Sequence, residues 1–88
     1  MLNDECFFTG MDKDRCICHH CFGGTANRKL SEIYGMKVWL VPEYHTSYPN
    51  GVHRNRRNDL RCKRYAQSKF EETHSREEFI SVFGKSYL

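Results

Sequence analysis

Histidine and cysteine are the side chains of this sequence best suited to chemistry, with five of each among 88 residues. Imidazole nitrogen and thiolate sulfur are the ligands that zinc and related transition metals prefer in proteins. Both types are concentrated in the segment Cys16-Ile-Cys-His-His-Cys21. Side chains alternate between the two faces of a strand, so one of His19 and His20 can bind a metal while the other faces a substrate. We therefore expect a metal site at this segment.

Two later histidines extend the set of candidate ligands. His45 follows an expected strand that Pro42 ends, and His53 follows the turn at Asn50-Gly51. Together with His19, they would supply three nitrogen ligands and leave one coordination position open. An open position distinguishes a catalytic metal site from a closed structural one. The sequence thus predicts a metal held by residues that lie far apart along the chain.

The cysteines support a second hypothesis for the metal site. Cys18 and Cys21 are spaced as half of a zinc knuckle and Cys16 lies beside them, so these three thiolates are alternative ligands. The odd number of cysteines excludes complete internal pairing. The acidic first five residues lack the basic and apolar regions of a secretory signal, so we expect a cytoplasmic, reducing location. No apolar run approaches the ~18 residues of a membrane span, and we expect no membrane partner.

Positive charge is concentrated in one part of the chain. The net charge is +3, yet residues 53–69 carry seven lysines and arginines against Asp59 as their single acid. Such a cationic block in an otherwise acidic chain predicts a face for a polyanion. Phosphate contacts from this face would give affinity without sequence specificity. The residues expected to contact DNA phosphates are Arg54, Arg56, Arg57, Arg61, Lys63 and Arg64.

The elements that position these residues are expected to form one α+β domain over residues 1–88. A chain of this length has a thin core, which often needs a metal or another staple. The expected strands are residues 5–9 and 16–22, paired as a β-hairpin, and residues 37–41. The expected helices are residues 27–34, a long basic helix over residues 54–73 with an apolar side at Cys62, Ala66 and Phe70, and a short helix after the Ser75-Arg-Glu-Glu78 capping box.

Several short segments carry a resemblance to a known family. They are Cys6-Phe-Phe-Thr-Gly10, His19-His20 with Phe22-Gly-Gly24, Asn27-Arg-Lys-Leu-Ser-Glu32 with Tyr34-Gly35, Pro42 with His45, Gly51-Val-His53, Gln67 with Phe70-Glu71, and Phe83-Gly-Lys85 with Tyr87-Leu88. Through them nearly the whole chain resembles the HNH, or ββα-metal, nuclease superfamily, specifically the short phage and prophage HNH-like proteins. The resemblance implies that His19, His45 and His53 bind the metal and that His20 is the catalytic general base. The paired CxxC knuckles of other members are not present here.

The function implied by this resemblance is that of a metal-dependent DNA endonuclease or nickase, which hydrolyses phosphodiesters with one divalent ion. An all-imidazole site favours zinc, with nickel, manganese or magnesium as further candidates in catalysis. The competing hypothesis is a zinc-stabilised phage protein without catalytic activity, such as an anti-CRISPR inhibitor that binds a host type II CRISPR effector. The surroundings of His20 separate the two hypotheses. An open cleft is expected of a nuclease, and an ion enclosed by four protein ligands is expected of a binding protein.

Overall fold

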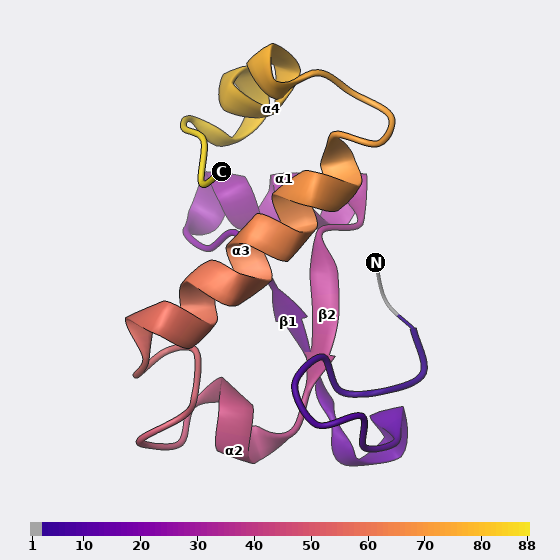
Figure 1. Ribbon diagram of the computed structural model, residues 1–88, viewed down its shortest axis with the longest axis vertical. Helices are drawn as coiled ribbons and strands as arrows, with labels where there is room; N and C mark the ends of the chain where they lie inside the picture. The colour runs from indigo at the N-terminus through magenta and orange to yellow at the C-terminus, as the bar shows by residue number, and fades with distance from the viewer. Residues whose placement is uncertain (1–2) are drawn as a thin grey trace.

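The structure, a computed structural model, describes residues 3–88 and has the expected α+β composition (Figure 1). A short 3-10 helix, η1, precedes the first strand, and three of the four α-helices follow the second strand along the chain without a further strand between them. The elements are η1 (Lys13–Arg15), β1 (Ile17–His20), α1 (Thr25–Tyr34), β2 (Lys37–Leu40), α2 (Pro42–His45), α3 (Arg56–Phe70) and α4 (Arg76–Phe83).

The two strands form one antiparallel sheet, in which Ile17 pairs with Leu40 and His20 pairs with Lys37. The predicted hairpin between residues 5–9 and 16–22 is therefore wrong, because β1 pairs across α1 with β2. The N-terminal segment contributes single bridges only, one of which joins Cys6 to Trp39. Its chain reverses at Gly10, where φ is 74° and the backbone N–H donates to the Cys6 carbonyl at 3.0 Å. That tight turn leaves too few extended residues to pair as a strand.

Local signals set the ends of the helices much as expected. Gly35 ends α1 in the left-handed conformation, which glycine adopts without a steric penalty. Pro42 ends β2 and becomes the first residue of α2, where its missing N–H costs nothing. The Asn55 side chain caps α3, and Ser75 with Glu78 forms the predicted capping box of α4. The predicted basic helix over residues 54–73 is thus confirmed with slightly shorter bounds.

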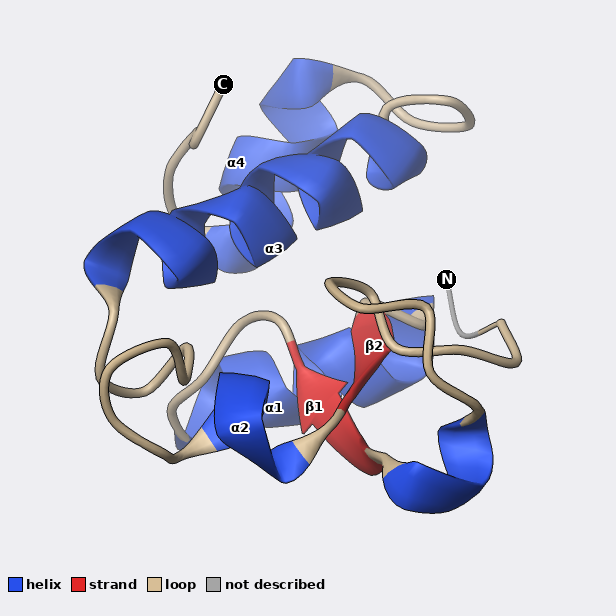
Figure 2. Cartoon of the chain, turned by 60° about the horizontal axis from the view of Figure 1, so that its bottom comes forward, coloured by secondary structure: helices blue, strands red, loops and turns tan. Residues whose placement is uncertain are grey.

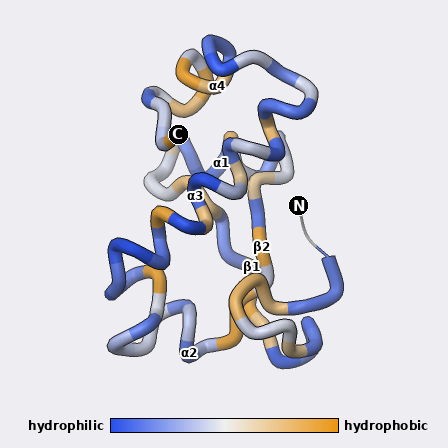
Figure 3. The backbone as a smooth tube through the Cα atoms, in the orientation of Figure 1, coloured by the Kyte–Doolittle hydropathy of each residue, from blue (hydrophilic) through white to orange (hydrophobic). Residues whose placement is uncertain are grey.

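The helices and the sheet lie in two layers. Figure 2 shows α3 and α4 in one layer over a second layer that holds the sheet, α1 and α2. The buried core between them includes Phe22, Leu40 and Phe79, each at most 1% exposed, and the expected apolar side of α3. In Figure 3, α3 is mainly hydrophilic with short hydrophobic stretches, as a helix with one buried side should be. No helix within residues 3–88 is both long enough and apolar enough to cross a membrane.

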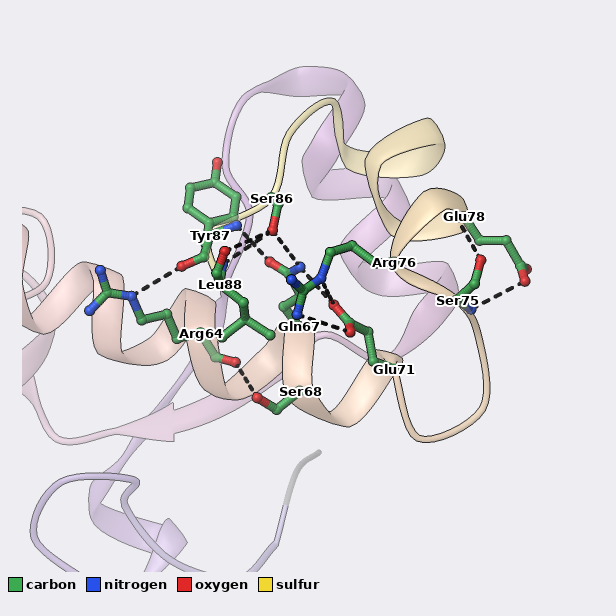
Figure 4. A network of polar contacts seen from close by, with 10 residues as sticks. All are labelled: Arg64, Gln67, Ser68, Glu71, Ser75, Arg76, Glu78, Ser86, Tyr87 and Leu88. Atoms are coloured by element: carbon green, nitrogen blue, oxygen red, sulfur yellow. Dashed lines mark hydrogen bonds and ion pairs between the residues drawn. The ribbon is translucent and has the colours of Figure 1, made fainter.

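A polar network fastens the C-terminal segment to α3 (Figure 4). Gln67 is fully buried, and its side chain accepts from the backbone N–H of Tyr87 at 2.7 Å and donates to Ser86 at 3.0 Å. The Arg64 guanidinium donates to the Tyr87 carbonyl at 3.1 Å. Since every buried polar group in this network has a partner, burying Gln67 carries no desolvation penalty of an unpaired amide.

Candidate metal centre

Three histidines from separate parts of the fold meet in space. His19 lies in β1, His45 is the last residue of α2, and His53 follows in the loop that leads to α3. One ligand nitrogen from each lies within 4.8 Å of the other two. Their ring centroids are 4.7 to 5.4 Å apart, and the Nε2 atoms of His45 and His53 are separated by 3.1 Å. The structure thus brings together the three residues that the sequence predicted as nitrogen ligands.

The backbone of the loop after α2 holds His53 against His45. The Val52 N–H donates to the Tyr44 carbonyl at 2.9 Å, and the His53 N–H donates to the His45 carbonyl at 3.1 Å. Gly51 makes this close approach possible, because a Cβ atom there would lie 2.6 Å from the Ser47 carbonyl oxygen and 2.8 Å from that of His45. Any other residue at position 51 would therefore collide with the backbone that follows His45 unless the loop moved.

Two asparagines fasten the same loop to the start of α3. The Asn58 side chain is 8% exposed and donates to the Asn50 carbonyl at 2.9 Å. Asn55 caps α3 through the Asn58 N–H and donates its amide to the Pro49 carbonyl at 3.2 Å. Sequence analysis did not find Asn58, since an asparagine inside an expected helix carries no signal of a contact eight residues earlier.

The nitrogens of this cluster include buried atoms without a hydrogen-bond partner. His19 is 6% exposed, and neither its Nε2 atom nor the Nδ1 atom of His45 has a partner among the described residues. Burial and the neighbouring His45 and His53 lower the pKa of His19 to about 4. Burial, followed by the nearby His53, also lowers the pKa of His45. These two imidazoles are therefore neutral at pH 7, and their unshared electron pairs are free to bind a cation.

The cluster fits a tetrahedral metal ion on chemical grounds. Zinc–imidazole bonds of about 2.0–2.1 Å place the ligand nitrogens of a tetrahedral site about 3.3 Å from one another. The 3.1 Å separation between His45 and His53 already lies near that value. A bound cation would also give the buried Nε2 atom of His19 the partner that it lacks. Three ligands leave one position of the tetrahedron to water or substrate.

His20, the next residue of β1, turns its ring toward α1. Its Nε2 atom lies 2.8 Å from Oε2 of Glu32 in α1, and Oε1 of that carboxylate accepts from the Lys37 ammonium at 2.9 Å. The hydrogen bond from Lys37, followed by that from His20, lowers the pKa of Glu32 and keeps it ionised. Nothing in a spacing of twelve residues between a strand and a helix identifies the pair of His20 and Glu32, and sequence analysis did not predict it.

Both histidines of the pair border open space. A cavity of about 400 Å³ is lined by His19, His20, His45 and His53 together with Gly24 and Arg28. The His20 side chain is 21% exposed. The three clustered imidazoles and His20 therefore border one cavity.

The three cysteines of the alternative hypothesis do not form a group of three converging ligand atoms among the described residues. The thiol of Cys16 points toward the Asp12 carbonyl at 3.5 Å, and Cys18 is half-buried in the sheet. Cys21 is 1% exposed beside Cys62, and burial raises the pKa of both thiols, that of Cys62 to about 12. Among residues 3–88, the group able to share one ion is that of the three histidines and not a group of thiols.

The predicted cationic face divides into cations with a partner in the protein and cations without one. Arg56 and Lys63 pair with Asp59 at 3.0 and 2.6 Å. Arg61 lies over the Phe8 ring, and Arg64 donates to the C-terminal segment. In the described part of the chain, Arg54 and Arg57 are exposed and have no hydrogen bond or ion pair from their side chains. Of the six predicted phosphate contacts, these two are therefore the ones left without a partner in the described part of the chain.

No family model, no curated protein and no solved structure matches this chain. The family stays a prediction. The resemblance to HNH nucleases rests on the motifs quoted above, and the case for a function rests on the geometry of the histidine cluster and of His20.

Proposed function

We propose that this protein is an HNH-like, metal-dependent DNA endonuclease or nickase. The observation that carries the proposal is that two neighbouring residues of β1 have different surroundings. His19 joins two distant imidazoles in a cluster suited to a metal, while His20 faces the same cavity and is held by a carboxylate. A metal site with an adjacent, oriented base is the minimum that hydrolysis of a phosphodiester requires.

Zinc is the ion that the donor set favours. The proposed ligands are the nitrogens of His19, His45 and His53, and magnesium prefers oxygen donors. Nickel and manganese are further candidates in catalysis. When bound, the ion would polarise a phosphate oxygen and stabilise the negative charge that develops on the leaving oxygen.

His20 would act as the general base. With Nε2–H donating to Glu32, the unshared electron pair of the neutral ring lies on Nδ1, which can accept a proton. A water molecule in the cavity would transfer a proton to His20 as its oxygen attacks phosphorus. The P–O ester bond opposite the attacking oxygen would break. Glu32 fixes both the tautomer and the orientation of the ring, as carboxylates do beside many catalytic histidines.

The competing hypothesis of a non-catalytic, zinc-stabilised binding protein makes a different demand on the site. It requires a fourth protein ligand and a buried or ligating His20. The cluster within residues 3–88 offers three ligands, and His20 is partly exposed beside a cavity. These features favour the nuclease over an inhibitor of a CRISPR effector.

The substitution His20→Ala tests the nuclease. We expect it to abolish metal-dependent nicking of supercoiled plasmid DNA, assayed with zinc, nickel, manganese and magnesium, because the base is lost while all three proposed ligands remain. Metal content, measured by atomic emission spectroscopy, should equal that of the wild type. His74→Ala removes a histidine outside the cluster and should leave nicking unchanged. Retained cleavage in His20→Ala would refute the assignment of the base, and a wild type inactive with every metal would refute the nuclease.

A further inference from the structure

An ion pair of α3 lies close to the histidine cluster. The Lys63 ammonium is 2.6 Å from Oδ1 and 2.7 Å from Oδ2 of Asp59, one helical turn earlier. The Arg56 guanidinium donates to Oδ2 of the same carboxylate at 3.0 Å. The side chains of Asp59 and Lys63 are 17% and 14% exposed. Because both are largely shielded from water, their charges act on nearby groups more strongly than those of an exposed pair.

The same ion pair borders a cavity together with two histidines of the cluster. This cavity has a volume of about 280 Å³, and Asp59, Lys63, His19 and His53 all line it. His19 and His53 also line the cavity of about 400 Å³ described above. Among residues 3–88, Asp59 is the one acid that lines either cavity. The carboxylate that faces the cluster therefore comes from α3, a helix that supplies no proposed ligand.

The two charges of the pair do not cancel at His19. Burial and the neighbouring His45 and His53 lower the pKa of this residue to about 4. The Asp59 carboxylate opposes these causes and raises the pKa of His19, whereas the Lys63 ammonium lowers it by a smaller amount. A positive charge at the cluster is thus attracted by Asp59 more strongly than it is repelled by Lys63.

A divalent ion in the cluster needs a negative charge nearby. Imidazoles bind a metal in their neutral form, so three of them leave both charges of the ion uncompensated. The converging ligand atoms within residues 3–88 belong to the three histidines and do not include an oxygen of Asp59. The carboxylate therefore has the charge that the ion requires, at a position outside the ligands.

We propose that Asp59 is a charge-compensating residue of the metal centre, which acts on the ion across the cavity without being a ligand. This inference rests on the metal site of the proposed function and not on the nuclease activity. Lys63 has the opposite influence and reduces the effect of the Asp59 charge on the ion. Groups just outside the ligands of a metal typically change its affinity 10- to 100-fold.

A purely structural role of Asp59 makes a different prediction. The residue lies in the first turn of α3, where a negative charge also stabilises the helix through its dipole. If Asp59 served only the helix and the pair with Lys63, loss of either member of the pair would affect zinc binding alike, through the stability of the fold.

The zinc affinity of paired variants tests the proposal. Asp59→Asn keeps the shape of the side chain and an oxygen that can accept from Lys63, but it removes the charge. We expect its dissociation constant for zinc, measured by competition with a chromophoric chelator, to rise about tenfold or more. Lys63→Met removes the opposing charge and should bind zinc at least as tightly as the wild type. Glu77→Gln removes an acid from the first turn of α4, outside both cavities, and should leave the constant unchanged.

Urea unfolding with a chelator present measures the structural contribution of the pair. Asp59→Asn and Lys63→Met disturb the same ion pair, so both should lower the stability of the metal-free protein. Weaker zinc binding in Asp59→Asn alone would then follow from its charge and not from a loss of stability. Wild-type zinc affinity in Asp59→Asn, or an equal loss of affinity in both variants, would overturn the proposal.

Cobalt in place of zinc distinguishes a charge-compensating residue from a ligand. The cobalt-loaded Asp59→Asn protein should keep the visible absorption bands of the wild type, because its three proposed ligands are unchanged. A shift of these bands would make Asp59 a ligand and overturn its position outside the ligands. A wild type whose zinc binding depends on Asp59 but which nicks no DNA would refute the nuclease alone. A wild type that binds no zinc would overturn the metal centre and this inference together.

Discussion

His19 is the residue whose surroundings most constrain what this protein does. Its ring is buried between two other imidazoles, one of its nitrogens has no partner, and its pKa is lowered to about 4. A buried polar atom without a partner destabilises the fold by about 1–3 kcal/mol. A cation bound to this nitrogen would remove that cost. The side chain that destabilises the metal-free fold would then be a metal ligand.

The lowered pKa of His19 predicts how the stability of the metal-free protein depends on pH. Above pH 6.5 the ring is neutral in both the folded and the unfolded chain. As the pH falls from 6.5 toward 4, the unfolded chain takes up a proton that the folded chain does not, so the free energy of unfolding decreases. The shift from 6.5 to about 4 corresponds to a loss of at most about 3 kcal/mol. The lowered pKa of His45 acts in the same direction.

Urea unfolding between pH 7 and pH 4, with a chelator present, measures this dependence. The carboxylates of the chain also titrate in the range, so His19→Asn serves as the reference. Asparagine does not titrate, and the variant should lose less stability than the wild type over the same interval. Identical slopes in the two proteins would contradict the buried, neutral state of His19.

Glu32 is predicted to be a positioning residue for His20. Glu32→Gln keeps an oxygen that can accept from Nε2 but removes the charge and the pairing with Lys37, so the ring loses its fixed orientation. We expect kcat for nicking to fall about tenfold or more with little change in KM, as substitutions beside catalytic ligands do. Thermal stability should change little, because the Glu32 side chain is 60% exposed and exposed ion pairs contribute little. Glu72→Gln, which removes another exposed carboxylate, should leave kcat unchanged.

Among the secondary-structure elements, the short segments that follow β2 position two of the three proposed ligands. Residues 42–45 form α2, and the loop after it returns to place His53 beside His45. This loop is held to the start of α3 by the buried side chain of Asn58. The position of one proposed ligand therefore depends on a hydrogen bond from a helix that supplies no ligand itself.

Asn58→Ala tests this dependence. The variant leaves the Asn50 carbonyl without its partner and should lower the free energy of unfolding by about 1–3 kcal/mol. It should also weaken zinc affinity, because His53 is no longer fixed. Ser75→Ala is the matched control, since loss of the cap of α4 costs about 1 kcal/mol far from the histidines. Isothermal titration with zinc should separate the two, and equal affinities would show that Asn58 acts on stability alone.

Elements with strong local signals could be predicted from the sequence, and the pairing between them could not. The caps and apolar spacing of α1, α3 and α4 are properties of neighbouring residues, and they gave nearly correct bounds. The strand at residues 5–9 was expected from its aromatic residues, but Gly10 reverses the chain and β1 pairs with β2 instead. Which strands pair depends on packing across the whole fold, since aromatic residues favour any half-buried surface.

The candidate site was likewise predictable only in part from the sequence. Spacing and residue type, together with the resemblance to HNH proteins, predicted that His19, His45 and His53 would converge. Glu32 and Asn58 were not predicted, because charged and amide side chains are common on helices and their partners lie in other elements. The cationic face differs in this respect, because Asp59 engages Arg56 and Lys63 within α3 itself, at the spacings of three and four residues that bring charges together on one helix.

For the molecule as a whole, the histidine cluster joins β1 in the sheet to α2 and to the loop before α3. A chain of 88 residues buries only about 60–65% of the surface that it exposes when unfolded, so its core supplies a small margin of stability. A metal that binds the folded chain and not the unfolded chain adds to that margin by mass action. Folding and metal binding should therefore be coupled.

Thermal unfolding with and without zinc measures this coupling. With zinc at 100 times its dissociation constant, the stabilisation is about 2.7 kcal/mol. For a domain of this size that corresponds to a rise of about 10–20 °C in Tm, which a chelator should reverse. His19→Asn should lose the rise, because it removes the ligand that bridges the sheet to the other two histidines. Cys18→Ser should keep it. A rise that persists in His19→Asn and disappears in Cys18→Ser would place the metal on the cysteines, and no rise in the wild type would remove the metal from the fold.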